Sequence, residues 1–368
     1  MRIASFFYAR GAPPLRALAR RPGASLGPQA LFVCFALGLC APASAESPSA
    51  PAVSWGRVDI QSATLSTRYR FIENSSRDVT TSQLQFKDTA RIRVKLDEGG
   101  RFAVTGGLLT GNTFTSGWDN TGIGTGHLAG TQGLRHLFVS AAARGLEVQA
   151  GGLYVNHGES TEITSYDDDG YLMGERLTLR RPAHAYFDEV SVTRAALSPS
   201  SSPGVIRHLS LLGHQHYWQV QVVKHYGSAI STSADFTDAA GAETLRAAVA
   251  VHSPKGAPVS LLRYEQYRRV TMQPADGFAV SAERRIARVR LQAGYADIDA
   301  EYGGLNADRF QRGRRVFAAA AIPIRGPLSA QLFATRAFTR AYPISNRTRV
   351  DAVVTYDLLR ALHRNRAR

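Results

Sequence analysis

The sequence predicts an all-β fold: a closed antiparallel transmembrane β-barrel of about 14 strands, with 12–16 as the allowed range, preceded by a signal peptide. Three observations predict it. Apolar and polar residues alternate with a period of two, and many alternating stretches exceed the roughly five or six residues usual for strands of soluble proteins. Short connections also alternate with long ones, as they do in barrels of this kind. The even composition after the N-terminal region favours one domain.

Residues 1–45 have the features of a secretory signal peptide. Five arginines precede the apolar run of residues 30–39, and Ala43-Ser44-Ala45 supplies the small residues needed before a cleavage site. The apolar run is shorter than the roughly 20 residues of a transmembrane helix. We therefore expect an exported mature chain, in which residues 46–56 form a short periplasmic lead-in.

The composition points to an exported, basic chain. It has 44 basic and 29 acidic residues, a net charge of +15, and only five of the basic residues lie in the predicted leader. Both cysteines, Cys34 and Cys40, lie in the leader as well. An exported chain of this length without disulfides has to be stabilised by a large core or a closed sheet. The basic residues are spread along amphipathic strands, which argues against nucleic acid as a partner.

The alternation is clearest between residues 83 and 96. The even positions there are apolar apart from Asp88, whereas the odd positions are polar or basic. The pattern returns in residues 288–295 and 349–358. Successive side chains of a strand point to opposite faces. One face of each stretch is therefore expected to meet lipid and the other to face the barrel interior.

The predicted barrel extends over residues 57–359 and is followed by a basic C-terminal tail, residues 360–368. An even number of strands places both chain ends on the periplasmic side. Residues 97–100 and 253–256 are read as short turns, and residues 227–242 as a long external connection. The alternating stretches are 60–73, 82–97, 101–110, 133–142, 145–155, 176–196, 206–226, 243–253, 257–268, 277–284, 286–298, 313–323, 327–339 and 347–359.

The inward face of these strands is expected to line a pore. A barrel of about 14 strands is wider than its own side chains can fill. Clustered cations raise the local concentration of anions, so the sequence predicts a porin-like channel for passive passage of small polar or anionic solutes. In the alternative interpretation, lumen arginines pair with lumen acids and selectivity is weak. The expected pore-lining residues are Arg68, Arg70, Lys87, Arg91, Arg93, Lys95, Arg263, Arg288, Arg290, Arg349, Glu147, Glu189 and Glu265.

Residues 146–192 resemble the central hairpin of alginate-export-type outer-membrane porins. The likeness is carried by residues 148–154, 156–158, 171–177 and 186–192. Gly152-Leu153 stands where that family usually has an Arg-Gln pair. The resemblance implies a passive channel in the bacterial outer membrane, with an arginine-rich constriction suited to acidic sugars.

Two other functions fit an exported barrel: a membrane-embedded hydrolase acting on lipid or acylated sugar, and a surface receptor or adhesin. The candidate catalytic groups are His157, Glu159, Ser160, His214, His216 and His225. No Gly-x-Ser-x-Gly elbow is present to activate a serine. We therefore predict no catalytic residue and no enzyme.

No metal or cofactor site is predicted either. Asp167-Asp168-Asp169-Gly170 resembles part of a calcium loop but lacks the terminal glutamate of the twelve-residue motif. It is expected to be a solvated external loop. The expected partners are outer-membrane lipid, lipopolysaccharide, the barrel-assembly machinery and the permeating solutes.

Overall fold

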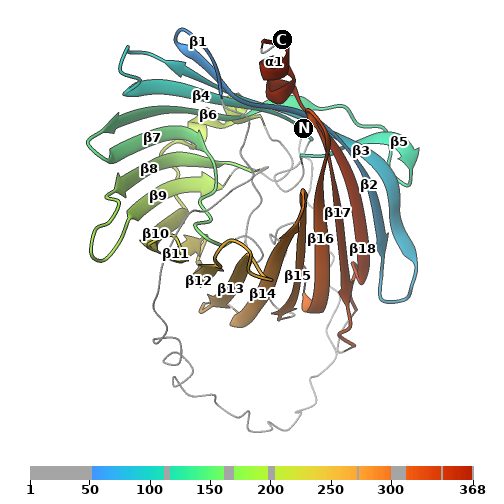
Figure 1. Cartoon of the computed structure of the whole chain (residues 1–368). Coiled ribbons are helices and arrows are strands. Elements are labelled where there is room, and N and C mark those ends of the chain that lie inside the picture. Colours follow the sequence, from blue (N-terminus) through green and yellow to red (C-terminus); the bar gives the residue numbers. More distant parts are fainter. Residues whose placement is uncertain are drawn as a thin grey trace, which may run out of the picture. The chain divides into compact units, whose positions relative to one another are not determined.

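The computed structural model describes residues 52–111, 117–160, 170–197, 204–271, 273–299, 312–340 and 343–366 (Figure 1). These residues belong to one compact unit, which spans Ala41–Arg368. No helix in this part of the chain is long and apolar enough to cross a membrane. The elements are β1 (Val53–Trp55), β2 (Val58–Glu73), β3 (Val79–Lys95), β4 (Phe102–Thr110), β5 (Asp119–Gly124), β6 (Gln132–Ala143), β7 (Leu146–Leu153), β8 (Leu172–Arg180), β9 (Glu189–Leu197), the 3-10 helix η2 (Val205–Leu211), β10 (Tyr217–Tyr226), β11 (Ile230–Ala239), β12 (Ala242–His252), β13 (Leu261–Arg269), β14 (Ala275–Ile286), β15 (Val289–Ile298), β16 (Gly313–Arg325), β17 (Leu328–Ala337), β18 (Thr348–Asp357) and α1 (Leu358–Arg366).

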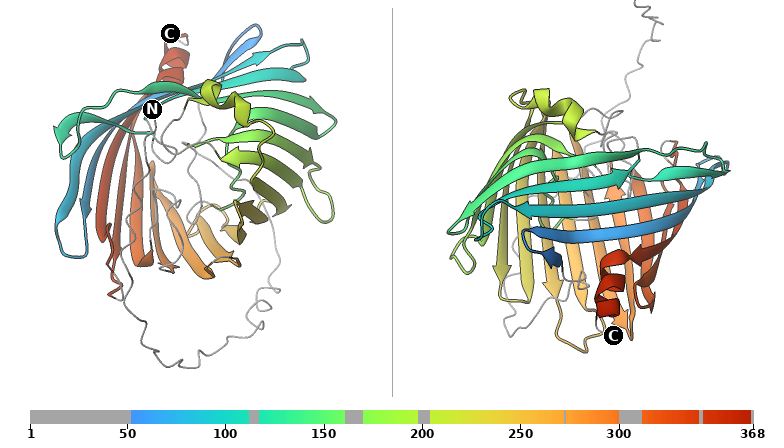
Figure 2. Two further views of the ribbon diagram at one scale, coloured as in Figure 1. Left: turned by 180° about the vertical axis from the view of Figure 1, so that it is seen from behind. Right: turned by 90° about the horizontal axis from the view of Figure 1, so that it is seen from above.

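The strands form one antiparallel sheet that closes on itself. Of the 18 strands described, β1 pairs only with β2 and β5 only with β3, so the closed ring has 16 strands. The ring closes where β18 pairs with β2 (Figure 2). The register of this pair places Asp351 opposite Arg70. A closed sheet pairs every strand on both sides and leaves no open edge.

The ring has two strands more than the sequence estimate of about 14, although it lies within the allowed range. Residues 176–196 contain parts of two strands, β8 and β9, because the chain turns between them without a glycine and Ala183 adopts a φ of +64°. Residues 227–242 contain β11, which the sequence analysis assigned to a loop. Its outward positions include the polar Thr232 and the small Ala234, so apolar alternation is weak there.

The strands have an apolar face outside and a polar face inside. On β10, Trp218 and Val220 are 43% and 42% exposed, whereas Gln219 and Gln221 are each 1% exposed. The predicted alternation is thus confirmed, and it is the reverse of a soluble protein, whose apolar face is buried. Several exposed aromatic side chains fit interfacial positions on such a barrel: Tyr69, Trp218, Tyr226, Tyr264, Phe338 and Tyr356.

Asp188 links the turn between β8 and β9 to the end of β10 through hydrogen bonds. Its Oδ1 accepts the Ala183 amide at 2.7 Å and lies 3.3 Å from Lys224 Nζ, and its Oδ2 accepts the His225 amide at 2.6 Å. The hydrogen bond from the His225 amide, helped by the Ala183 amide and the Lys224 ammonium, lowers the pKa of Asp188 to about 2.

The substitution Asp188→Asn is expected to lower the free energy of unfolding by about 1–2 kcal/mol at pH 7, because it removes a charge-assisted set of hydrogen bonds. A carboxyl whose pKa is lowered on folding stabilises the fold above its unfolded pKa of 3.8, and this contribution is lost as the pH falls through about 2. The difference between variant and wild type should therefore shrink below pH 4 in urea unfolding experiments in detergent micelles. Asp276→Asn, at an exposed site, is the control. An equal difference at pH 7 and pH 2 would contradict the assignment.

Candidate functional site: the barrel interior

Basic side chains line one wall of the interior. Three neighbouring strands, β18, β2 and β3, carry them at alternate positions, on the face opposite the exposed Leu65, Tyr69 and Val94. The structure thus brings together seven of the residues expected from the sequence: Arg68, Arg70, Lys87, Arg91, Arg93, Lys95 and Arg349.

Ion pairs neutralise part of this wall. Asp351 of β18 accepts Arg70 Nε at 2.9 Å and also pairs with Arg349. Lys95 Nζ lies 2.9 Å from a carboxylate oxygen of Asp59. The alternative in which lumen arginines meet lumen acids therefore describes these groups.

Two arginines of the same wall bond to neutral groups. Arg68 donates from Nε to Gln85 Oε1 at 2.9 Å, and its guanidinium carbon lies 4.1 Å from the ring centroid of Trp118. Arg91 Nε donates to the Tyr154 hydroxyl at 2.7 Å, with its guanidinium 3.7 Å from the centre of that ring. These neutral partners hold the side chains in place.

The other expected residues lie elsewhere on the wall. Glu147 of β7 and Glu189 of β9 both pair with Arg180 of β8, which sequence analysis did not single out. On β13, Arg263 Nε lies 4.0 Å from Glu265 Oε1. The remaining two are at the turn between β14 and β15: Arg288 and Arg290.

The chain turns into the interior after β7. The main chain of Tyr154 accepts a 2.6 Å hydrogen bond from Arg176, a buried residue of β8 whose Nε also donates to Thr193. The Tyr154 ring stacks on His136 at a centroid distance of 3.7 Å and an interplanar angle of 17°. Three contacts therefore hold Tyr154: its carbonyl bonds to Arg176, its ring stacks on His136 and its hydroxyl accepts from Arg91.

From this point residues 154–160, which we call the inward segment, run along the inner wall. Asn156 donates from Nδ2 to Ser191 Oγ of β9 at 2.8 Å, and its carbonyl accepts Gln219 Nε2 of β10 at 2.8 Å. The Glu159 amide donates to Ser233 Oγ of β11 at 2.9 Å. The segment therefore crosses the inner face of three neighbouring strands.

The far end of the inward segment reaches β13. Ser160 Oγ donates to Glu265 Oε2 at 2.8 Å, and both residues are buried. Gly158 makes the close approach that this path requires: it has a φ of +58°, and a Cβ there would lie 2.8 Å from Gln221 Nε2. Hydrogen bonds to the polar inner faces of β9, β10, β11 and β13 thus hold the segment against the wall.

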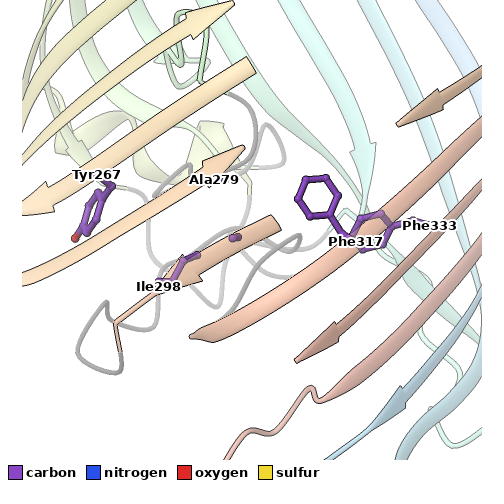
Figure 3. Close-up of a cluster of buried hydrophobic side chains, with 6 residues drawn as sticks. Tyr267, Ala279, Ile298, Phe317 and Phe333 are labelled. Atoms are coloured by element: carbon purple, nitrogen blue, oxygen red, sulfur yellow. The ribbon is translucent and has the colours of Figure 1, made fainter. Parts of the chain in front are cut away.

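An apolar cluster lies on the interior wall of β13 to β17. Tyr267 of β13, Ala279 of β14, Ile298 of β15, Phe317 of β16 and Phe333 of β17 form a buried cluster (Figure 3). The sequence analysis treated the inward face as polar throughout, so this cluster was missed. Small residues on neighbouring strands leave room for the two phenylalanine rings; one of them, Phe317, lies over Gly294.

Three of the candidate catalytic residues belong to the inward segment: His157, Glu159 and Ser160. The Ser160 hydroxyl donates to a carboxylate, as described above, and His225 Nε2 lies 3.7 Å from Glu159 Oε1. His214 and His216 lie in the connection before β10. The acidic run at 167–169 lies outside the described residues, and no cluster of metal-binding side chains occurs in the part of the chain that the structure describes.

The chain forms a membrane-spanning β-barrel, because its 16-strand sheet is closed and the outer face of that sheet is apolar. The inward segment covers part of the interior wall. The structure is similar to a mutant of the porin from Rhodopseudomonas blastica, with 12% identity, coverage of 80% of this chain and 99% of that chain, and a TM-score of 0.51. A triple mutant of the same porin matches with 10% identity, the same coverage and a TM-score of 0.51. These similarities show the fold. No protein-family model matches the sequence, and no curated protein is similar to it.

Proposed function

We propose that this protein is a passive channel of the bacterial outer membrane, rather than an enzyme, and that it passes small polar solutes with a preference for anions. A barrel of this size encloses a water-filled lumen. The exported, disulfide-free chain and the outward apolar face support the location.

The position of the inward segment carries the proposal. Residues 156–160 of the segment lie on the inner face of β9 to β13, whereas the basic wall is built by β18, β2 and β3. In the ring of 16 strands, β11 and β2 are eight places apart, which is half of the ring. A solute in the lumen would therefore pass between residues 156–160 and the cations of Arg68, Lys87 and Arg93. That arrangement narrows the lumen at a place where the field favours anions.

Acidic sugars are the solute class that we propose within this function. Carboxylates on a sugar can accept bidentate hydrogen bonds from guanidinium groups. Trp118 places an aromatic ring beside the guanidinium of Arg68. The sequence resemblance to alginate-export-type porins supports the same class.

Planar-bilayer recording tests the proposal. The purified protein should produce stable open steps, and a KCl gradient should give a reversal potential of the sign expected for anions. Oligouronates added to one side should reduce the current more than neutral oligosaccharides of the same length. A barrel that conducts no ions but hydrolyses phospholipid would overturn the channel proposal, and equal block by both sugars would overturn the acidic-sugar proposal.

A further inference from the structure

The 3-10 helix η2 lies on the outside of the barrel wall. It contacts β6, β7 and β8. Val205 is fully buried against Tyr171 and Met173. Met173 belongs to the same outer face of β8 as the exposed Leu177, four residues further along. Protein therefore replaces lipid over this part of the outer surface.

A socket in the barrel wall receives η2. Gly152 lies on the outer face of β7, and a Cβ at this position would come within 2.3 Å of Val205 Cγ2. The Tyr171 hydroxyl is 2.7 Å from His208 Nδ1, which adds a polar contact to the apolar one. The glycine and the tyrosine fix η2 against the barrel, so its outer face is a defined surface.

That outer face is apolar. A 3-10 helix has three residues per turn, so residues three apart share a face. Val205, His208 and Leu211 form the face toward the barrel. The next face is apolar and exposed: Ile206 is 61% exposed, Leu209 41% and Leu212 43%. The third face is polar and exposed: Arg207 and Ser210.

We propose that η2 is a lipid-contacting strap, whose Ile206, Leu209 and Leu212 face the acyl chains of the external leaflet and whose Arg207 faces their phosphate headgroups. The surface is continuous with the lipid-facing belt, since Val139 and Val148 are exposed on the strands beneath it. An apolar face beside a basic residue is typical of interfacial segments.

The position in the barrel supports this placement. β9 is the seventh strand of the closed ring, so the connection after it lies at the end opposite the start of β2. Figure 2 (right) shows η2 and α1 at opposite ends of the barrel. The proposal depends on the barrel spanning a membrane and not on what passes through it.

Spin labelling in phospholipid vesicles tests the strap. Cys34 and Cys40 are replaced by serine, and a nitroxide is attached at Leu209→Cys, at Ser210→Cys on the polar face, or at Val148→Cys on the belt. Accessibility to oxygen, which partitions into lipid, is compared with accessibility to a water-soluble nickel chelate. The oxygen-to-nickel ratio at position 209 should exceed that at position 210 roughly threefold, because only the apolar face meets acyl chains. It should not exceed the ratio at position 148, which lies deeper in the membrane.

Two results would overturn the proposal. A nickel accessibility at position 209 equal to that at position 210 would place η2 in water. Low accessibility to both reagents, with dipolar broadening between labels, would show that a second copy of the chain covers this face. Gly152→Leu provides an independent check, since filling the socket should displace η2 and raise the mobility of the label at position 209. An unchanged spectrum in a folded Gly152→Leu barrel would contradict the socket.

Discussion

The double substitution Lys87→Gln and Arg93→Gln is expected to lower the anion-to-cation permeability ratio by roughly threefold to tenfold. A unit charge about 8 Å from a passing ion contributes about 0.5 kcal/mol in a water-like dielectric, and salt reduces this value. The two residues flank Arg91 on the inner face of β3. Arg91 is left unchanged because its guanidinium holds Tyr154. The reversal potential in a KCl gradient measures the ratio.

A matched control removes two charges from the outer face. Arg268 of β13 and Arg336 of β17 are exposed and lie on the same side as Tyr264 and Leu332. Replacing both with glutamine changes the net charge by the same amount but should leave the reversal potential within error. An equal shift in both double variants would mean that overall charge, and not the basic wall, sets the selectivity.

The substitution Tyr154→Ala should raise the single-channel conductance and the open-channel noise. It removes the stack on His136 and both contacts with Arg91, which together hold the start of the inward segment. Aromatic and cation–π contacts are worth about 0.5–1.5 kcal/mol each. Once these contacts are lost, the inward segment should move away from the inner wall for part of the time. The current through the lumen should then be larger on average and should fluctuate more. Single-channel recording at fixed voltage measures both quantities.

Tyr154→Phe separates the ring from the hydroxyl. The phenylalanine keeps the stack on His136 and the face that Arg91 covers, and it loses only the hydrogen bond to Arg91 Nε. Its conductance should therefore stay close to that of the wild type. If the alanine variant folds, inserts and conducts with unchanged amplitude and noise, the inward segment is not what limits the current.

Much of the fold could be predicted because lipid imposes a simple pattern on each strand. β3 shows this best, since its even positions from Leu84 to Val94 face outward as expected. The pattern failed where outward residues are small or polar, as on β11, where Thr232 and Ala234 separate the buried serines. It also failed between β8 and β9, where a turn was formed by residues without glycine.

Strand alternation predicts which face a side chain occupies, but not which residues it meets. Arg70 and Lys87 were placed on the inner face by their positions alone. Their partners depend on register between strands far apart in the sequence, as in the pairing of Arg70 with Asp351. Arg176 and Trp118 were missed for another reason: what they contact, Tyr154 and Arg68, becomes clear only once the loops enter the barrel.

The pairing of β2 with β18 has a kinetic consequence. Each other neighbour in the ring follows closely along the chain, whereas Ser66 and Thr355, bonded across this seam at 2.9 Å, are 289 residues apart. Loop-closure entropy makes such a contact slow to form. Asp351 then acts as a check on the seam, because a slip by one residue would turn its carboxylate toward lipid and away from Arg70. Closure of the barrel in a register shifted by one residue is therefore disfavoured.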